Sequence, residues 1–184
     1  MLSVNELQGT LLKAGRGAGL PLGLSEDLSM AAPDIAIGDT NDIIVQIVHC
    51  LAMPFDPATA DLSGQGVVMG PGNLLLTLPS ALDLVTTDNG PVVVNDAPQA
   101  LANALIAGRE RVEGKALWAD WIGPSKLILH GWKSDRYTPP QQPERVAINQ
   151  AHWTALQTYV AKTFVPQSNA SRLAGAGAGL TDND

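Results

Sequence analysis

The hydrophobic pattern of the chain differs between its ends and its middle, and this difference limits the fold more than any other feature. Near both ends, apolar residues recur at the spacing of an amphipathic helix. This spacing, together with capping residues, predicts helices at 3–13, 23–32, 41–52 and 149–163, and the caps alone predict a further helix at 97–107. In the middle, short runs rich in leucine and β-branched residues are separated by Gly, Pro, Asn and Asp, which is typical of strands. The sequence therefore predicts a single α+β domain, with helices at both ends around a small central β-sheet.

Individual residues mark where several of these elements begin and end. Ser3 and Glu6 have the spacing of a capping box. The glycines of residues 15–19 are expected to end the first helix, Pro33 to end the second, and Gly108 to cap the helix at 97–107. We expect at least four strands between residues 66 and 148, taken from the runs 66–70, 73–78, 82–86, 91–95, 126–132 and 145–148.

Length and composition favour a globular protein of the cytoplasm. The 184 residues are 45% hydrophobic, enough for one domain with a real core. A single cysteine, Cys50, cannot form an intramolecular disulfide, which fits a reducing compartment. The first eight residues lack the pattern of a secretory signal, and no apolar run approaches the roughly 18 residues of a membrane span. We therefore expect a cytoplasmic protein with no membrane partner.

The charge distribution argues against nucleic acid as a partner. The net charge is −7, and the acidic side chains are concentrated in the first hundred residues. An acidic protein repels the phosphate backbone at long range. The second half carries more basic residues and all four tryptophans, which is one way to build a base-stacking surface. Because no nucleic-acid motif accompanies them, we expect these tryptophans to belong to the core.

Two nearly identical glycine segments are the most unusual motif. Residues 15–20 read GRGAGL and residues 175–180 read GAGAGL. Both lack the third glycine of a dinucleotide fingerprint, and no phosphate-binding P-loop or metal-ligand spacing of the three histidines is present, so we expect no cofactor and no metal. Glycines do let consecutive backbone amides converge on an anion. The alternative is that both segments are flexible connectors with surface arginines.

The same segments resemble a family. Residues 16–21 (RGAGLP), with acidic residues beyond them, and the run SRLAGAGAGLTDND at 171–184 resemble a bacterial family of uncharacterised proteins, domain of unknown function 3726. The resemblance covers about forty residues at the two ends. It departs from the family pattern at position 22, where Leu22 stands in place of a frequent tryptophan. The resemblance implies that the glycine segments are a signature, and it implies no reaction.

These residues give two hypotheses for function. In the first, the protein acts on or binds a small anionic metabolite, with Glu26 and Asp27 as catalytic acid and base. The ligand-binding residues would be Arg16, Gly17, Gly19, Arg172, Asp182 and Asp184. In the second, the same residues form a non-catalytic binding or accessory module. Asp182 and Asp184 are also oxygen donors for Mg²⁺ or Ca²⁺, although we favour a solvated acidic tail over a metal site.

Both hypotheses make structural predictions. The Arg16 guanidinium should pair with Glu26, Asp27, Asp182 or Asp184, or face a pocket. The glycine-rich tail at 167–184 should dock on the domain, because only contacts can repay the entropy of ordering its glycines. The two glycine segments should then lie near each other, within one chain or across a symmetric homo-oligomer.

Overall fold

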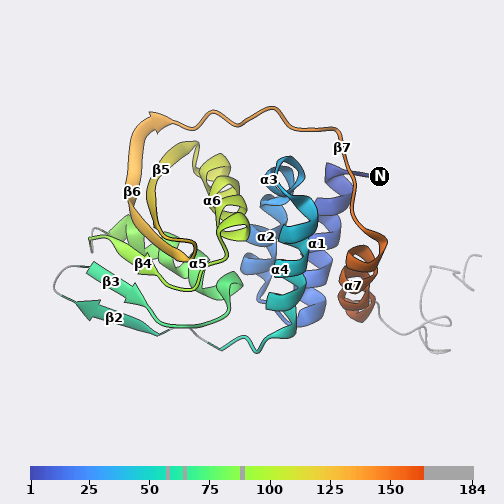
Figure 1. Cartoon of the computed structure of the whole chain (residues 1–184), viewed down its shortest axis with the longest axis horizontal. Coiled ribbons are helices and arrows are strands. Elements are labelled where there is room, and N and C mark those ends of the chain that lie inside the picture. Colours follow the sequence, from blue (N-terminus) through green and yellow to red (C-terminus); the bar gives the residue numbers. More distant parts are fainter. Residues whose placement is uncertain (57–58, 64–65, 88–89, 164–184) are drawn as a thin grey trace, which may run out of the picture.

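The computed structural model describes residues 1–56, 59–63, 66–87 and 90–163, and it has the predicted α+β architecture. A curved sheet lies on one side of the molecule and a group of helices on the other (Figure 1). Helices α5 (Leu74–Leu84) and α6 (Gln99–Glu113) contact the sheet and also contact α2 (Leu22–Met30). The core therefore fills the space between one face of the sheet and the helices.

Four helices form the N-terminal part: α1 (Val4–Ala18), α2, α3 (Ala32–Ile37) and α4 (Thr40–Ala52). The capping box at the start of α1 is confirmed, because the Glu6 amide donates to Ser3 Oγ at 3.1 Å and the Ser3 amide donates to Glu6 Oε2 at 2.7 Å. These bonds satisfy amides that have no partner inside the helix. The first turn of α1 is thus determined by local sequence.

The first helix is longer than predicted, although the glycine segment at 15–19 does end it. Helix α1 continues through Arg16 to Ala18, and Gly19 caps it in the left-handed region at a φ of 98°. Gly17 sits inside the helix because a Cβ there would overlap the carbonyl oxygen of Tyr159 in α7 (Gln150–Val160). The glycine thus allows two helices to approach closely.

Of two other predicted helix ends, the one at Pro33 is close to the observed end and the one at Gly108 is wrong. Helix α2 ends at Met30, two residues before the predicted end at residue 32. Pro33 lies in the first turn of the next helix, α3, where a missing amide costs nothing. Gly108 lies inside α6, and a Cβ on it would come within 3.0–3.1 Å of the backbone of Met30 and Ala31. Helix α6 ends instead at Gly114, which has a φ of 67°.

The five-stranded sheet has the order β2-β3-β4-β6-β5. Strands β3 and β4 are parallel and all other neighbours are antiparallel. The bounds are β2 (Ala60–Ser63), β3 (Gly66–Met69), β4 (Val92–Val94), β5 (Lys115–Ile122) and β6 (Lys126–Arg136). The prediction of at least four strands between 66 and 148 is confirmed, since β7 (Arg145–Val146) adds to β3, β4, β5 and β6.

The predicted strands at 73–78 and 82–86 are wrong. Most of these residues form α5, which connects the parallel strands, followed by a 3-10 turn at Val85–Thr87. The Asn73 side chain begins α5 by accepting a hydrogen bond from the Leu75 amide at 3.1 Å. A buried leucine-rich run has no distinguishing period, so its sequence fits a strand or a buried helix equally well.

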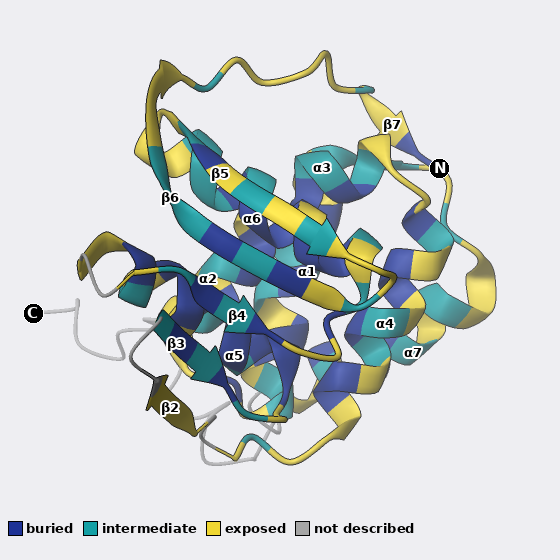
Figure 2. Cartoon of the chain, turned by 60° about the vertical axis from the view of Figure 1, so that its left-hand side comes forward, coloured by how far each residue is buried: buried dark blue, intermediate teal, exposed yellow. Residues whose placement is uncertain are grey.

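In the part of the chain that the structure describes, helices cover one face of the sheet and leave the other open. Val67, Val92 and Leu129 are in register across three strands and are fully buried. Their neighbours on the other face, Val68 and Ile128, are half-buried, and Figure 2 shows exposed positions along β5 and β6. Beside this core, the short ribbon of β1 (Leu2–Ser3) and β7 brings α7 next to α1. No helix in the described part of the chain is long and apolar enough to cross a membrane.

Candidate functional site

The first glycine segment does not form the predicted anion-binding turn. The Gly19 amide donates to the carbonyl oxygen of Arg16 at 3.1 Å, and the Leu20 amide donates to that of Gly15 at 2.9 Å. Gly17 lies within α1, where amides bond along the helix. The prediction of a nest around Gly17 and Gly19 is therefore wrong, because the helix end uses these amides itself.

Arg16 lies exposed in the last turn of α1, where a cation favours the helix dipole. Within the described ranges, the structure shows no ion pair between Arg16 and Glu26 or Asp27, and Asp27 faces Arg109 instead. Arg172, Asp182, Asp184 and the second glycine segment lie outside the described residues. An anion held between Arg16 and the tail, and the closeness of the two glycine segments, therefore stay predictions.

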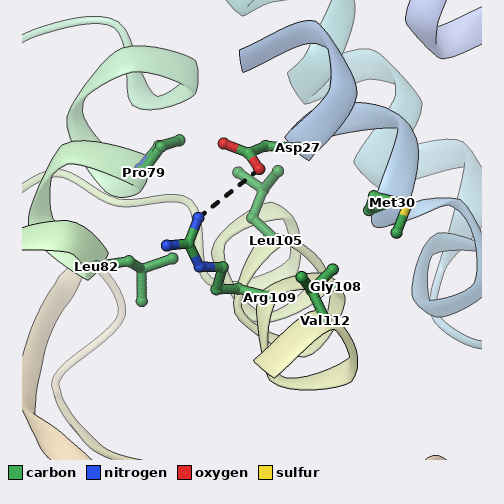
Figure 3. A pocket seen from close by; sticks show the side chains of 8 residues that line it. All are labelled: Asp27, Met30, Pro79, Leu82, Leu105, Gly108, Arg109 and Val112. Atoms are coloured by element: carbon green, nitrogen blue, oxygen red, sulfur yellow. Dashed lines mark ion pairs between the residues drawn. The ribbon is translucent and has the colours of Figure 1, made fainter. Parts of the chain in front are cut away.

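The structure instead gathers charged side chains where α2, α5 and α6 meet (Figure 3). Arg109 Nη2 donates to Asp83 Oδ1 at 2.8 Å, and Arg109 Nη1 lies 3.9 Å from Asp27 Oδ1. Glu113 Oε1 lies 3.1 Å from Arg109 Nε, although this N–H is not aligned for a hydrogen bond. One guanidinium thus holds three carboxylates from three helices.

Helical spacing explains why these side chains meet. Asp27 and Met30 are three residues apart on α2, so they share a face. On α6, Arg109 is followed by Val112 and Glu113 at three and four residues, which places all three side chains on one side. Each helix therefore presents both charged and apolar groups to the same space.

That space is a surface groove with a volume of about 650 Å³. We call it the Arg109 groove; its walls are formed by Pro21, Gly23, Leu24, Glu26, Asp27, Ser29, Met30, Asp83, Arg109 and Val112. A narrow hollow of about 10 Å³ lies beside it, lined mainly by apolar side chains and with room for about one water molecule. The groove therefore combines an apolar surface with an excess of carboxylates over its single guanidinium.

The Asp27 carboxyl has a perturbed titration. Burial raises its pKa above the ordinary value, the nearby Arg109 partly lowers that pKa, and the negative charges of Asp83 and Glu26 raise it further. Water stabilises the negative charge of a carboxylate poorly in this half-buried position. A positive group brought into the groove would therefore gain from pairing with it.

Two of the predicted site residues lie in this groove, and their predicted catalytic role stays a prediction. Glu26 and Asp27 were predicted as site residues, and both line the groove. Arg109 and Asp83 were missed because the predicted helix ended at 107 and residues 82–86 were predicted as a strand. The spacing of Arg109 and Glu113, four residues apart, is a signal that α6 continues past Gly108.

A second group of side chains lies on the face of the sheet that no described helix covers. An irregularity in the pairing of β5 with β6 falls at Trp118, opposite Gly131, which has a φ of 152°. Beside it, His130 Nε2 lies 3.0 Å from Asp120 Oδ2, and the His130 ring stacks on Trp118 with centroids 4.4 Å apart. No cluster of three metal-ligating side chains occurs in the ranges that the structure describes.

Comparisons with known proteins give no indication of function, so the function is inferred from these two groups of side chains. No family model, no curated protein and no solved structure matches the chain. The resemblance of the glycine segments to the family of unknown function stays a prediction. Of the two groups of side chains, the Arg109 groove offers both charge and an apolar surface to a ligand.

Proposed function

We propose that the protein binds a small organic cation with an apolar portion in the Arg109 groove, and that it acts as a binding module. The observation that supports this proposal is the arrangement of three carboxylates around one guanidinium beside an apolar wall. Ligand sites commonly combine an apolar surface with a few polar groups that fix orientation. Here the polar groups favour a positive ligand.

Charge decides between a cationic and an anionic ligand. Glu26, Asp27 and Asp83 line the groove, and Arg109 is the single cation among its lining residues. An anion reaching Arg109 would have to displace a carboxylate that already contacts it. An ammonium group can pair with the same carboxylates without breaking an existing contact. The groove thus favours a ligand of opposite charge to the anionic metabolite first expected.

The hydrogen bonds and ion pairs of the groove residues support a role in ligand binding. Ser29 supplies the one hydroxyl among the described lining residues, and its Oγ donates to the Glu26 carbonyl oxygen at 2.8 Å. Glu26 is exposed on the rim, whereas Asp27 is turned toward Arg109. Asp27 therefore serves as the partner of the ligand cation, and Glu26 strengthens the negative potential around it.

Replacing Asp27 with asparagine should weaken binding of hexylammonium, a probe with one ammonium and a six-carbon apolar chain. We expect the dissociation constant of the Asp27→Asn variant to rise about fivefold, because an ion pair at a half-buried groove position contributes about 1 kcal/mol. The titration is followed by amide chemical shifts in α2 and α6 of the full chain. Asp61→Asn removes the same charge from an exposed position on β2 and should leave the constant unchanged.

The pH dependence provides a second check on the same variants. Because burial raises the pKa of Asp27, its carboxyl takes up a proton at a higher pH than an exposed aspartate does. The cation binds the deprotonated form, so the wild-type advantage over Asp27→Asn should shrink as the pH falls through that raised pKa. Equal affinities of the two proteins at neutral pH would contradict the assigned role of Asp27.

A further inference from the structure

We propose that residues 171–173 of the same chain, Ser171, Arg172 and Leu173, occupy the Arg109 groove when no other ligand is bound. This inference rests on the proposed function, because it concerns the same groove. The segment carries a cation next to a large apolar side chain. That is the combination that the groove favours.

The groove side of this contact is open. Val112 is 55% exposed and Met30 is 37% exposed, so two apolar side chains on its walls remain in solvent. The Asp83 carboxylate keeps 66% of its side chain exposed although it contacts Arg109. A segment laid along the groove can therefore cover apolar surface and still reach a carboxylate.

The segment is singled out by charge. Among residues 164–184, which follow the last described residue, Arg172 is the only cation in the sequence. The acidic residues Asp182 and Asp184 come ten or more positions later, beyond a run of glycine and alanine that lets them turn away. Arg172 can thus enter an acidic groove without bringing the acidic end with it.

The chain is long enough to make this contact. Thr163 lies against α1, since its Cγ2 is 3.4 Å from a Cβ built on Gly17. Pro21, one of the residues that line the groove, follows Gly17 by four residues, which limits their separation to about 15 Å. The nine residues from Thr163 to Arg172 span up to about 30 Å. A tethered segment of this length has an effective concentration near the millimolar range, so a weak contact is enough to hold it.

Docking of this segment makes it a competitor of the external cation. The tail and the ligand would both pair with Asp27 and Asp83, so binding of one displaces the other. A tethered competitor raises the apparent dissociation constant of the ligand. The factor is one plus the ratio of the millimolar effective concentration of the tail to the dissociation constant of the tail for the groove. Charge reversal at Arg172 should therefore tighten ligand binding.

Disulfide trapping in the full chain tests this contact. Ala174→Cys, next to the proposed anchor, is combined with Val112→Cys on the groove wall, and oxidised glutathione supplies the oxidant. Cys50 is buried and burial raises the pKa of its thiol, so it reacts slowly under native conditions. The matched control combines Ala174→Cys with Ile122→Cys on β5, since Ile122 is also 55% exposed.

We expect the groove pair to form its disulfide about tenfold faster than the control pair, and Arg172→Glu to remove this advantage. Added hexylammonium should slow the groove pair alone. Equal rates for the two pairs would overturn the docking, while the hexylammonium titration would still decide the proposed function. Fast trapping of the groove pair that hexylammonium does not slow would support the docking and count against the proposed ligand.

Discussion

Replacing Gly17 with alanine is expected to lower the free energy of unfolding by about 2 kcal/mol, despite the higher helix propensity of alanine. The new Cβ would overlap the carbonyl oxygen of Tyr159, so α7 must move away from α1. A backbone atom cannot rotate aside as a side chain can. In a domain of this size the loss corresponds to a fall of about 4–8 °C in the melting temperature.

Gly9 provides the matched control on the same helix. A Cβ built on Gly9 meets nothing within 4 Å, so Gly9→Ala gains helix propensity without a collision. We expect Gly9→Ala to stabilise the protein by about 0.5–1 kcal/mol. Thermal and urea unfolding of the two variants measure both changes in the free energy of unfolding. Stabilisation by both alanines would show that α1 and α7 are not in the contact described.

Removing the positive charge of Arg111 should lower the free energy of unfolding more than Gly17→Ala does. Its guanidinium donates to both oxygens of Asp34 at 2.8 and 2.9 Å, and the Asp34 side chain is only 8% exposed. Arg111→Met would leave that carboxylate buried without its partner, which costs about 3 kcal/mol. We expect urea unfolding to shift to a correspondingly lower midpoint.

A double variant separates the ion pair from the packing of the arginine chain. Arg111→Met combined with Asp34→Asn removes both charges, and it should recover at least about 1 kcal/mol relative to Arg111→Met alone. Arg136→Met, at an exposed position on β6, serves as the control and should change stability by less than about 0.5 kcal/mol. If Arg111→Met matched this control, the pair would have no role in holding α3 to α6.

The parts of the fold that local chemistry determines could be predicted from the sequence. Ser3 and Glu6 form their capping box, and the Asp39 side chain accepts a hydrogen bond from the Asp42 amide at 3.2 Å at the start of α4. The other elements depend on distant contacts. Residues 74–84 become a helix because α5 must connect two parallel strands, which need a crossover connection. Gly17 and Gly108 looked like helix ends, and their role is visible only once the neighbouring helix is in place.

In the site too, some features follow from local sequence and others from contacts between distant helices. Glu26 and Asp27 were picked out as adjacent acids near a glycine segment, and both do line the groove. Their predicted partner, Arg16, is exposed in the last turn of α1, whereas Arg109 reaches Asp27 from a helix far along the chain. Sequence spacing cannot show which arginine meets an acid on another helix, because the packing of α2 against α6 decides it.

The sign of the ligand charge is the central claim, and a titration of the unaltered full chain with three matched probes tests it most directly. Hexylammonium, 1-hexanol and hexanoate share a six-carbon chain and differ in charge. Amide chemical shifts in α2 and α6 should give the tightest binding for hexylammonium, by about fivefold over 1-hexanol, with hexanoate the weakest. Tightest binding of hexanoate, with shifts centred on Arg109, would contradict the account and assign the groove to an anion.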